Sequence, residues 1–519
     1  MKKYIKLASV AIFSLLVSSC SEEKVLNLSP INNISNEDAY SSPSLIALSV
    51  NGMYNAAQLG QFNTTSSNGG RGYVWGAAFV QQGDNRGEDV VNLQAFYQIT
   101  YQSTYDPNSA NNVYYWIDGY KLINRCNLVI EGVSKAVANN IISSAVGNDY
   151  IGQAKFLRAI THFELLAYFA QPYNFTATAS HPGIVYREVG IDTQGEIDSE
   201  ILKGRNTVAD CYSKVIADLN DAENLITQTA DKSLATKNAA IAFKTRVYLH
   251  QRKWDDVITE GAKTLAVNLL TATPNGPFVT SANLTNSESV FSIRHAPGTG
   301  QNPGVNAALA SQYKTRRLVC ISPIIWNDPS WLADDKRREE GVMVETVSGV
   351  KYTNKYKDGG TYTDAAPVIR YAEVVLNMAE AQARKSSPDL TAAISLLNSV
   401  RNRSLASPST QAYTAATLVT QADVVNAILK ERRIEFLMEG RRWSDIHRLL
   451  YDDIAATNGI PAKVGNGTNT AALYSTTTPY SGPYGEAAIP KTNFRILWPI
   501  PLQEINTNPT LAAQQNPNW

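Results

Sequence analysis

The sequence predicts a mainly α-helical fold in which paired helices form a scaffold of degenerate tetratricopeptide repeats. Apolar residues recur at helical spacing over residues 113–267 and 368–450. Short turns divide both stretches into helix pairs, with small Ala or Gly where the helices cross. Because each pair can bury its apolar face only against its neighbours, we expect one curved scaffold.

The composition is that of an ordinary globular protein. The chain has 519 residues, 44% hydrophobic and 18% charged, which is enough to bury a large core. Lys plus Arg equals Asp plus Glu at 46 each, so no global field attracts nucleic acid or anionic lipid. We therefore expect neutral partners and no nucleic acid.

The first 19 residues are typical of a secretory signal peptide. Lysines at positions 2 and 3 precede an apolar run over residues 5–17, which is too short to span a bilayer. The residues before Cys20 read Val-Ser-Ser and resemble a bacterial lipobox. We predict cleavage before Cys20 and a lipid on its sulfur, leaving residues 20–519 as a single domain.

The helices are expected in the following order. A first helix covers residues 44–57, after Pro43, and helical periodicity returns at 113–133. Thr207 is placed to cap a later helix. The other predicted helices are 153–169, then the pairs 238–250 with 254–265, 368–384 with 390–403, and 424–438 with 443–450.

Two stretches lack this periodicity and form the predicted loop-rich ligand region. Residues 60–110 are rich in Gly, Asn, Gln, Ser and Tyr and are expected to be a long loop. Residues 270–366 contain short alternating runs such as VFSIRH, which predict small strands between loops. Loops of this length in a compact domain are usually functional.

The stretch VVNAILKERRIEFLMEGRRWSDIHRLL, residues 424–450, carries charges on an apolar helix face. Arg432, Glu435 and Glu439 share the arc of the core-facing valines and isoleucine. Buried charges must be paired, so we predict a structural ion network with Arg441 or Arg442 as partners. The alternative is that the two glutamates form an acid/base pair or bind a metal. Nearby arginines would hold both ionised, which suits a general acid poorly.

The sequence offers no catalytic constellation, metal site or cofactor motif. It has no GxSxG, Walker or HExxH motif, and its five histidines lack metal-ligand spacing. Cys126, Cys211 and Cys320 form no CxxC pair, so we predict neither a disulfide framework nor structural zinc. A dispersed carboxylate pair of a glycosidase stays open, because the fold and not the spacing sets such pairs.

Aromatic and amide-rich loops are the feature with binding chemistry. Sugars present apolar C–H faces and hydroxyl edges, which suit a Trp or Tyr ring flanked by Asn, Asp or Arg. For each single ring, loop packing is an equally good interpretation. The candidate ligand-binding residues are Trp75, Asp84, Asn85, Arg86, Tyr97, Tyr313, Trp326 and Trp331.

Several motifs resemble the SusD/RagB family of nutrient-binding outer-membrane lipoproteins of Bacteroidetes. They are ERRIEFLMEGRRWSDIHRL, FLRAITHFELLAYF, VIRYAEVVLNMAEA and the ending PIPLQEINTNPTLAAQQNPNW. The resemblance covers nearly the whole mature chain, although Asn518 and Trp519 stand where the family commonly has Gly and Tyr. Ser21-Glu22-Glu23 is similar to the acidic tether of surface lipoproteins in this phylum.

This resemblance implies a non-catalytic, surface-exposed, lipid-anchored protein of the outer membrane that takes part in polysaccharide utilisation. It would bind a nutrient, with an oligosaccharide favoured, and pass it to a SusC-like TonB-dependent transporter. Two alternatives stay open at this stage. One is a surface glycoside hydrolase or peptidase, and the other is a helical-repeat scaffold without a ligand.

Overall fold

The computed structural model of the chain describes residues 36–60, 70–298 and 302–519. The predicted signal peptide and lipidation at Cys20 lie outside these ranges. The described part is mainly helical, which confirms the predicted fold class. No helix within it is both long enough and apolar enough to cross a membrane.

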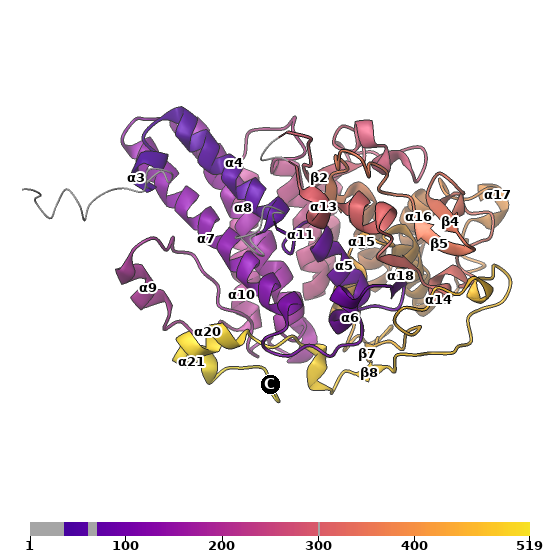
Figure 1. Cartoon of the computed structure of the whole chain (residues 1–519). Helices are drawn as coiled ribbons and strands as arrows, with labels where there is room; N and C mark the ends of the chain where they lie inside the picture. Colours follow the sequence, from indigo (N-terminus) through magenta and orange to yellow (C-terminus); the bar gives the residue numbers. More distant parts are fainter. Residues whose placement is uncertain (1–35, 61–69, 299–301) are drawn as a thin grey trace, which may run out of the picture.

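Eight helices form one continuous stack, because each packs against the next along the series (Figure 1). The contact of α12 with α15 joins the two predicted repeat blocks directly, so the residues between them leave the stack and return to it. The eight are α7 (Ala110–Ala138), α8 (Ser144–Phe169), α10 (Val208–Leu225), α11 (Lys237–Gln251), α12 (Trp254–Thr264), α15 (Tyr371–Arg384), α16 (Leu390–Arg401) and α18 (Gln421–Glu435).

Local sequence fixes where these helices begin and end. The Thr207 hydroxyl accepts a hydrogen bond from the Asp210 amide at 3.1 Å, so Thr207 caps α10 as predicted. Arg252 adopts a left-handed conformation with φ of 60° and ends α11. Helix α12 begins two residues later, which makes the predicted tight turn.

The other described helices are shorter or lie outside the stack. Helix α4 (Pro43–Leu59) corresponds to the first predicted helix and packs on α7 and α8. The rest are α3 (Asn36–Ala39), α5 (Ala77–Asn85), α6 (Ala95–Tyr101), α9 (Gln194–Glu200), α13 (Gly304–Ala307), α14 (Pro323–Trp326), α17 (Pro408–Gln411), α19 (Arg442–Arg448), α20 (Leu502–Thr507) and α21 (Pro509–Ala512).

Short strands pair only in twos among the described residues, and every pair is antiparallel. Four of the strands, β2, β3, β4 and β5, belong to the span 270–366 that was expected to hold small strands. The pairs are β1 (Val90–Asn92) with β3 (Val319–Ile321), β2 (Ser289–Ile293) with β6 (Ala366–Arg370), β4 (Val344–Val347) with β5 (Val350–Thr353), and β7 (Gly459–Ile460) with β8 (Ile489–Pro490).

The expectation of a long loop over residues 60–110 is wrong for about half of its described part. This part contains α5, α6 and β1, and all nine residues of α5 are buried. A helix buried on every side shows no apolar periodicity, because its polar residues are inside as well. The glutamines and asparagine of α5 therefore gave a loop-like composition to an interior helix.

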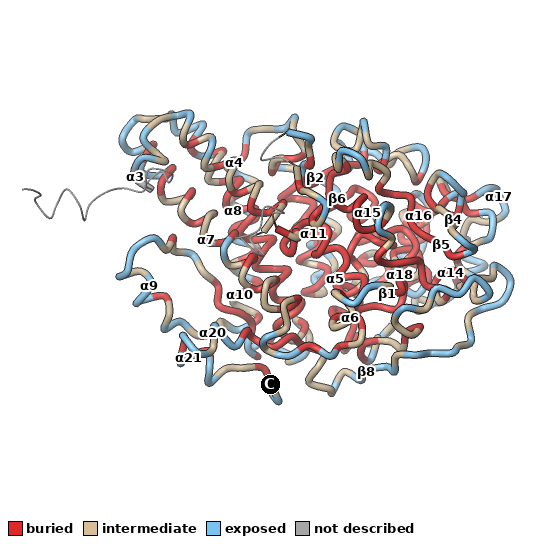
Figure 2. The backbone as a smooth tube through the Cα atoms, in the orientation of Figure 1, coloured by how far each residue is buried: buried red, intermediate tan, exposed pale blue. Residues whose placement is uncertain are grey.

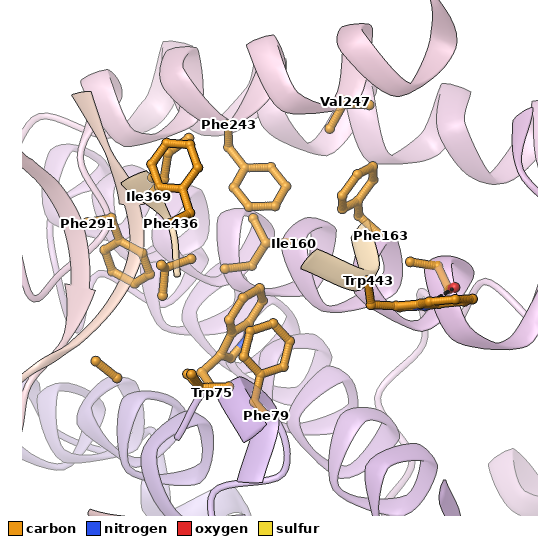
Figure 3. Close-up of a cluster of buried hydrophobic side chains, with 14 of the residues drawn as sticks. Trp75, Phe79, Ile160, Phe163, Phe243, Val247, Phe291, Ile369, Phe436 and Trp443 are labelled. Atoms are coloured by element: carbon orange, nitrogen blue, oxygen red, sulfur yellow. Dashed lines mark hydrogen bonds between the residues drawn. The ribbon is translucent and has the colours of Figure 1, made fainter. Parts of the chain in front are cut away.

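The core runs the length of the molecule, as the buried segments in Figure 2 show. In the close-up of Figure 3, side chains from α5, α8, α11 and α19 converge with those of β2 and β6. Phe163 and Phe243 meet edge to face with ring centroids 5.5 Å apart. This cluster connects the helical stack to β6 and to β2 of the span 270–366, which we call the insertion.

A close backbone contact holds α5 against the turn before α19. A β-carbon added to Gly83 would lie 2.2 Å from the carbonyl oxygen of Gly440. Gly440 itself has φ of +75°, a conformation that favours glycine. Both positions therefore require glycine.

We predict that Gly83→Ala lowers the free energy of unfolding by about 1–3 kcal/mol, because backbone atoms must move apart to admit the methyl group. The matched control is Gly52→Ala in α4, where a β-carbon meets nothing within 4 Å. That change should raise stability by up to about 1 kcal/mol. Urea denaturation measures both, and equal effects of the two variants would contradict the contact.

Candidate functional site

The structure places all eight predicted ligand-binding residues in the interior. Their exposed fractions run from 0% for Asn85, Arg86 and Tyr313 to 5% for Trp326. They therefore offer almost no ring face at the surface, as the loop-packing interpretation expects, and their role in ligand binding stays a prediction. The other four are Trp75 at 1%, Tyr97 at 1%, Asp84 at 3% and Trp331 at 2%.

Part of this set lies at the contact between α5 and the turn before α19. Asp84 accepts hydrogen bonds from the Tyr313 hydroxyl at 3.2 Å and from the Gly440 amide at 3.1 Å. Burial raises the pKa of the Asp84 carboxyl well above its usual range. The Arg86 guanidinium lies 3.7 Å from the ring centroid of Trp443. These groups hold interior elements together.

The two tryptophans of the insertion pack on a third side chain. Trp326 and Trp331 meet at a ring-centroid distance of 5.3 Å, and the Arg338 guanidinium lies 4.4 Å from each centroid. Arg338 also donates to both of their backbone carbonyls at 2.6 Å. An internal arginine therefore packs against both indole rings.

The five residues of the predicted ion network are each paired, but the partners of the two glutamates differ from those expected. Glu435 lies 2.5 Å from Arg403, 3.1 Å from Arg337 and 3.2 Å from Arg370. Glu439 lies 2.7 Å from Lys355 and 2.8 Å from Arg370.

The neighbouring arginines pair elsewhere. Arg441 reaches Glu164 of α8 at 3.1 Å, and Arg442 reaches Glu88 at 2.6 Å. Arg432 pairs with Asp445 at 2.9 Å. Arg441 Nε donates only to the backbone carbonyl of Glu439, at 3.5 Å, and within the described structure none of the three arginines forms an ion pair with the carboxylate of Glu435 or Glu439. The proposed pairing with Arg441 or Arg442 is therefore replaced by pairing with residues of the span 270–366, with Arg370 of β6 and with Arg403 after α16.

This network joins the insertion to the helical stack. Arg337 and Lys355 come from the span 270–366, whereas Glu435 ends α18. Burial alone would raise the pKa of Glu435, but the three arginines around it lower that pKa below its usual range. Glu435 is thus held ionised, and both glutamates are buried and paired with cations, which leaves them unsuited to acid/base catalysis.

A cavity of about 280 Å³ lies between α7, residues 185–191, α9 and α20. Its polar side chains bind one another: the Trp116 indole donates to Glu504 at 3.2 Å, and Arg187 donates to Glu200 at 2.9 Å. The remaining surface is largely aliphatic. It includes Ile123, Val185, Val189, Ile191, Ile197 and Ile201. The cavity suits an apolar group better than a sugar.

A larger and more polar concavity of about 530 Å³ lies further along α7. Tyr40, Glu131 and Lys135 line it together with the first residues of α9. Neither cavity contains any of the eight predicted residues.

The exposed aromatic rings are elsewhere. Among the described residues, only Phe175 and Tyr484 have large exposed fractions, 43% and 50%. Tyr484 was missed as a candidate, although Tyr480 to Tyr484 reads YSGPY and places two aromatics around turn-forming residues. That is the same signal that singled out Trp326 and Trp331.

Comparison with known proteins identifies relatives along most of the chain. A family described as "SusD family" matches residues 324–519, and one described as "Starch-binding associating with outer membrane" matches residues 26–249. "SusD-like protein P38" of Formosa agariphila is 24% identical over 509 residues, covering 86% of this chain and 92% of that protein.

Solved structures show the same fold. A SusD superfamily protein from Bacteroides fragilis is 25% identical, with a TM-score of 0.71 over 91% of this chain and 99% of that one. A SusD-like carbohydrate binding protein from Bacteroides vulgatus is 21% identical, with a TM-score of 0.69 over 91% and 97% of the two chains. The second likeness concerns the fold alone.

We predict that Glu435→Gln lowers the free energy of unfolding by about 3 kcal/mol or more, because three arginine contacts lose their counter-charge in the interior. The folded-state pKa of Glu435 is lowered, so its contribution is present above the unfolded pKa of about 4.3 and is lost as the pH falls. Between about pH 5 and pH 3 the variant should therefore lose less stability than the wild type.

Denaturant unfolding across this pH range tests the prediction. The control is Glu188→Gln, which removes an exposed partner of Lys214 and should change stability by less than about 1 kcal/mol. If the two variants unfold alike at pH 7, the network does not contribute as argued.

Proposed function

The chain belongs to the SusD/RagB family, and from this premise we propose that it captures an oligosaccharide at the cell surface without cleaving it. It then delivers the glycan to a SusC-like TonB-dependent transporter in the outer membrane. The observation that carries the proposal is the family match over two segments that together take in most of the helical stack and the C-terminal region. One of the two matching descriptions names starch binding and the outer membrane.

The chemistry of the described residues supports a binding role. Glu435 and Glu439 have the i, i+4 spacing of an acid/base pair, yet both are buried and held by arginine or lysine. Cleavage of a glycan by an acid/base pair would require two carboxyl groups that the glycan can reach. A binding protein needs only exposed rings and hydrogen-bonding groups.

Delivery sets a limit on affinity. A glycan must leave the protein to enter the transporter, and dissociation slows as binding tightens. We therefore propose modest affinity, with the helical stack as the rigid support and the anchor at Cys20 holding the protein at the membrane.

The capture role predicts binding without products. A chain beginning at Ser21 should bind members of a glycan array, with calorimetry confirming each positive, and the bound glycan should be recovered intact. Recovery of shortened glycans would replace the proposal with an enzyme. No response to any glycan would favour a scaffold role and remove the proposal.

The anchor has a separate test. Cys20→Ala removes the sulfur to which we expect the lipid to be attached, so the protein should lose lipid labelling and leave the membrane fraction. Metabolic labelling with an alkyne fatty acid and membrane fractionation measure the two effects. Unchanged labelling of the variant would rule out Cys20 as the acceptor.

A further inference from the structure

The most exposed aromatic ring of the described chain is that of Tyr484, in the segment that leads into β8; Figure 1 labels that strand. Half of Tyr484 is exposed, whereas the eight rings and polar groups expected to contact a ligand are interior. A glycan-contact surface built from described aromatic residues must therefore use rings other than those predicted.

A second tyrosine stands at a right angle to this ring. The ring centroids of Tyr480 and Tyr484 are 5.5 Å apart with an interplanar angle of 89°. Tyr480 packs against a small core cluster that includes Val464 and Tyr352, and its hydroxyl donates to the carbonyl of Pro483. Tyr480 is therefore a fixed wall, and Tyr484 presents a free face beside it.

Backbone pairing places polar groups next to this corner. Lys463 and Glu486 exchange backbone hydrogen bonds of 2.9 and 3.1 Å, as an antiparallel bridge does. Gly485 lies so close to Gly465 that a β-carbon on it would come within 2.4 Å of the Gly465 α-carbon. The two glycines allow the segment of Tyr484 to lie directly on the segment that carries Asn466.

The side chains along this contact form a chain of amide and carboxylate groups. Glu486 Oε1 accepts hydrogen bonds from Gln102 Nε2 at 2.9 Å and from the backbone N–H of Asn466 at 3.1 Å. Asn466 Oδ1 accepts from Asn92 Nδ2 at 2.7 Å. No hydrogen bond from a described residue reaches Glu486 Oε2 or uses Asn466 Nδ2, so one acceptor and one donor stay available on these two neighbouring residues.

We propose that Tyr484, Tyr480, Asn466 and Glu486 form a subsite for one sugar ring of a neutral glycan. The C–H face of the sugar stacks on Tyr484, and two of its hydroxyls bind Glu486 Oε2 and Asn466 Nδ2. Glu486 forms no salt bridge with a described residue, although Lys463 lies close enough for the two charges to interact, and its carboxylate disfavours uronic acids and sulfated sugars. This inference rests on the proposed function and names the sugar class of that function.

The test compares Tyr484→Ala with the wild type by calorimetry, using the neutral glycan that responds best on the array. We expect at least tenfold weaker binding and an unchanged melting temperature, because the ring is half exposed. Tyr484→Trp should keep the affinity. The matched control is Phe175→Ala, which removes a ring of similar exposure elsewhere and should leave binding unchanged.

The possible outcomes distinguish a failure of the proposed subsite from a failure of the proposed function. If the wild type binds glycans and Tyr484→Ala binds them equally well, the subsite is wrong and the proposed function stands. If Phe175→Ala weakens binding as much as Tyr484→Ala, the loss is not specific to this corner and the subsite is also wrong. If the wild type binds no glycan, both fall.

The charge of Glu486 allows a second test of the subsite, independent of the Tyr484 variants. The wild type should bind a neutral glycan at least tenfold more tightly than its uronic-acid counterpart, and Glu486→Gln should narrow that ratio. Tighter binding of the acidic sugar by the wild type would overturn the assignment to neutral glycans.

Discussion

The pairing of Glu435 and Glu439 with cations from other parts of the chain is the constraint on which the structure depends. A carboxylate removed from water is tolerated only when its counter-charges arrive with it. Arg370 by itself forms ion pairs with both of these glutamates and with Glu288 of the insertion. Helix α18, strand β6 and the insertion must therefore fold together, because each would otherwise leave charge unpaired in the interior.

The sequence was sufficient to predict the helical stack, because an amphipathic helix repeats its burial every three to four residues. The ends of helices were predictable where a single side chain caps the helix, as Thr207 caps α10. Helix α5 was not predictable in this way, since it is buried on all sides. The ion-pair partners of Glu435 could not be predicted either. Arg337 lies 98 positions earlier in the chain, and nothing in the local sequence pattern relates it to Glu435.

The candidate site shows a different limit. A tryptophan among turn-forming residues can face solvent or pack against an internal cation, and both satisfy the indole. Trp326 and Trp331 do the second, with Arg338 between them. The same local pattern around Tyr484 leaves its ring exposed. Composition therefore identified the kind of residue that binds a glycan, but only the three-dimensional packing decides which rings are accessible.

The direct contact of α12 with α15 has an evolutionary consequence. The helical stack is continuous across this contact, so the chain between the two helices is a cassette, that is, a segment inserted at a single point of the stack. A lineage can lengthen, trim or replace much of that cassette without shifting the register of the helices. The exceptions are the residues whose ion pairs connect this span to the stack and its adjoining turns. Among the described residues they include Glu288, Arg337, Lys355, Arg370 and Asp328, which pair with Arg403, Glu431, Glu439, Glu435 and Lys430 respectively. Changes in sequence are therefore tolerated best in the stretches between these positions.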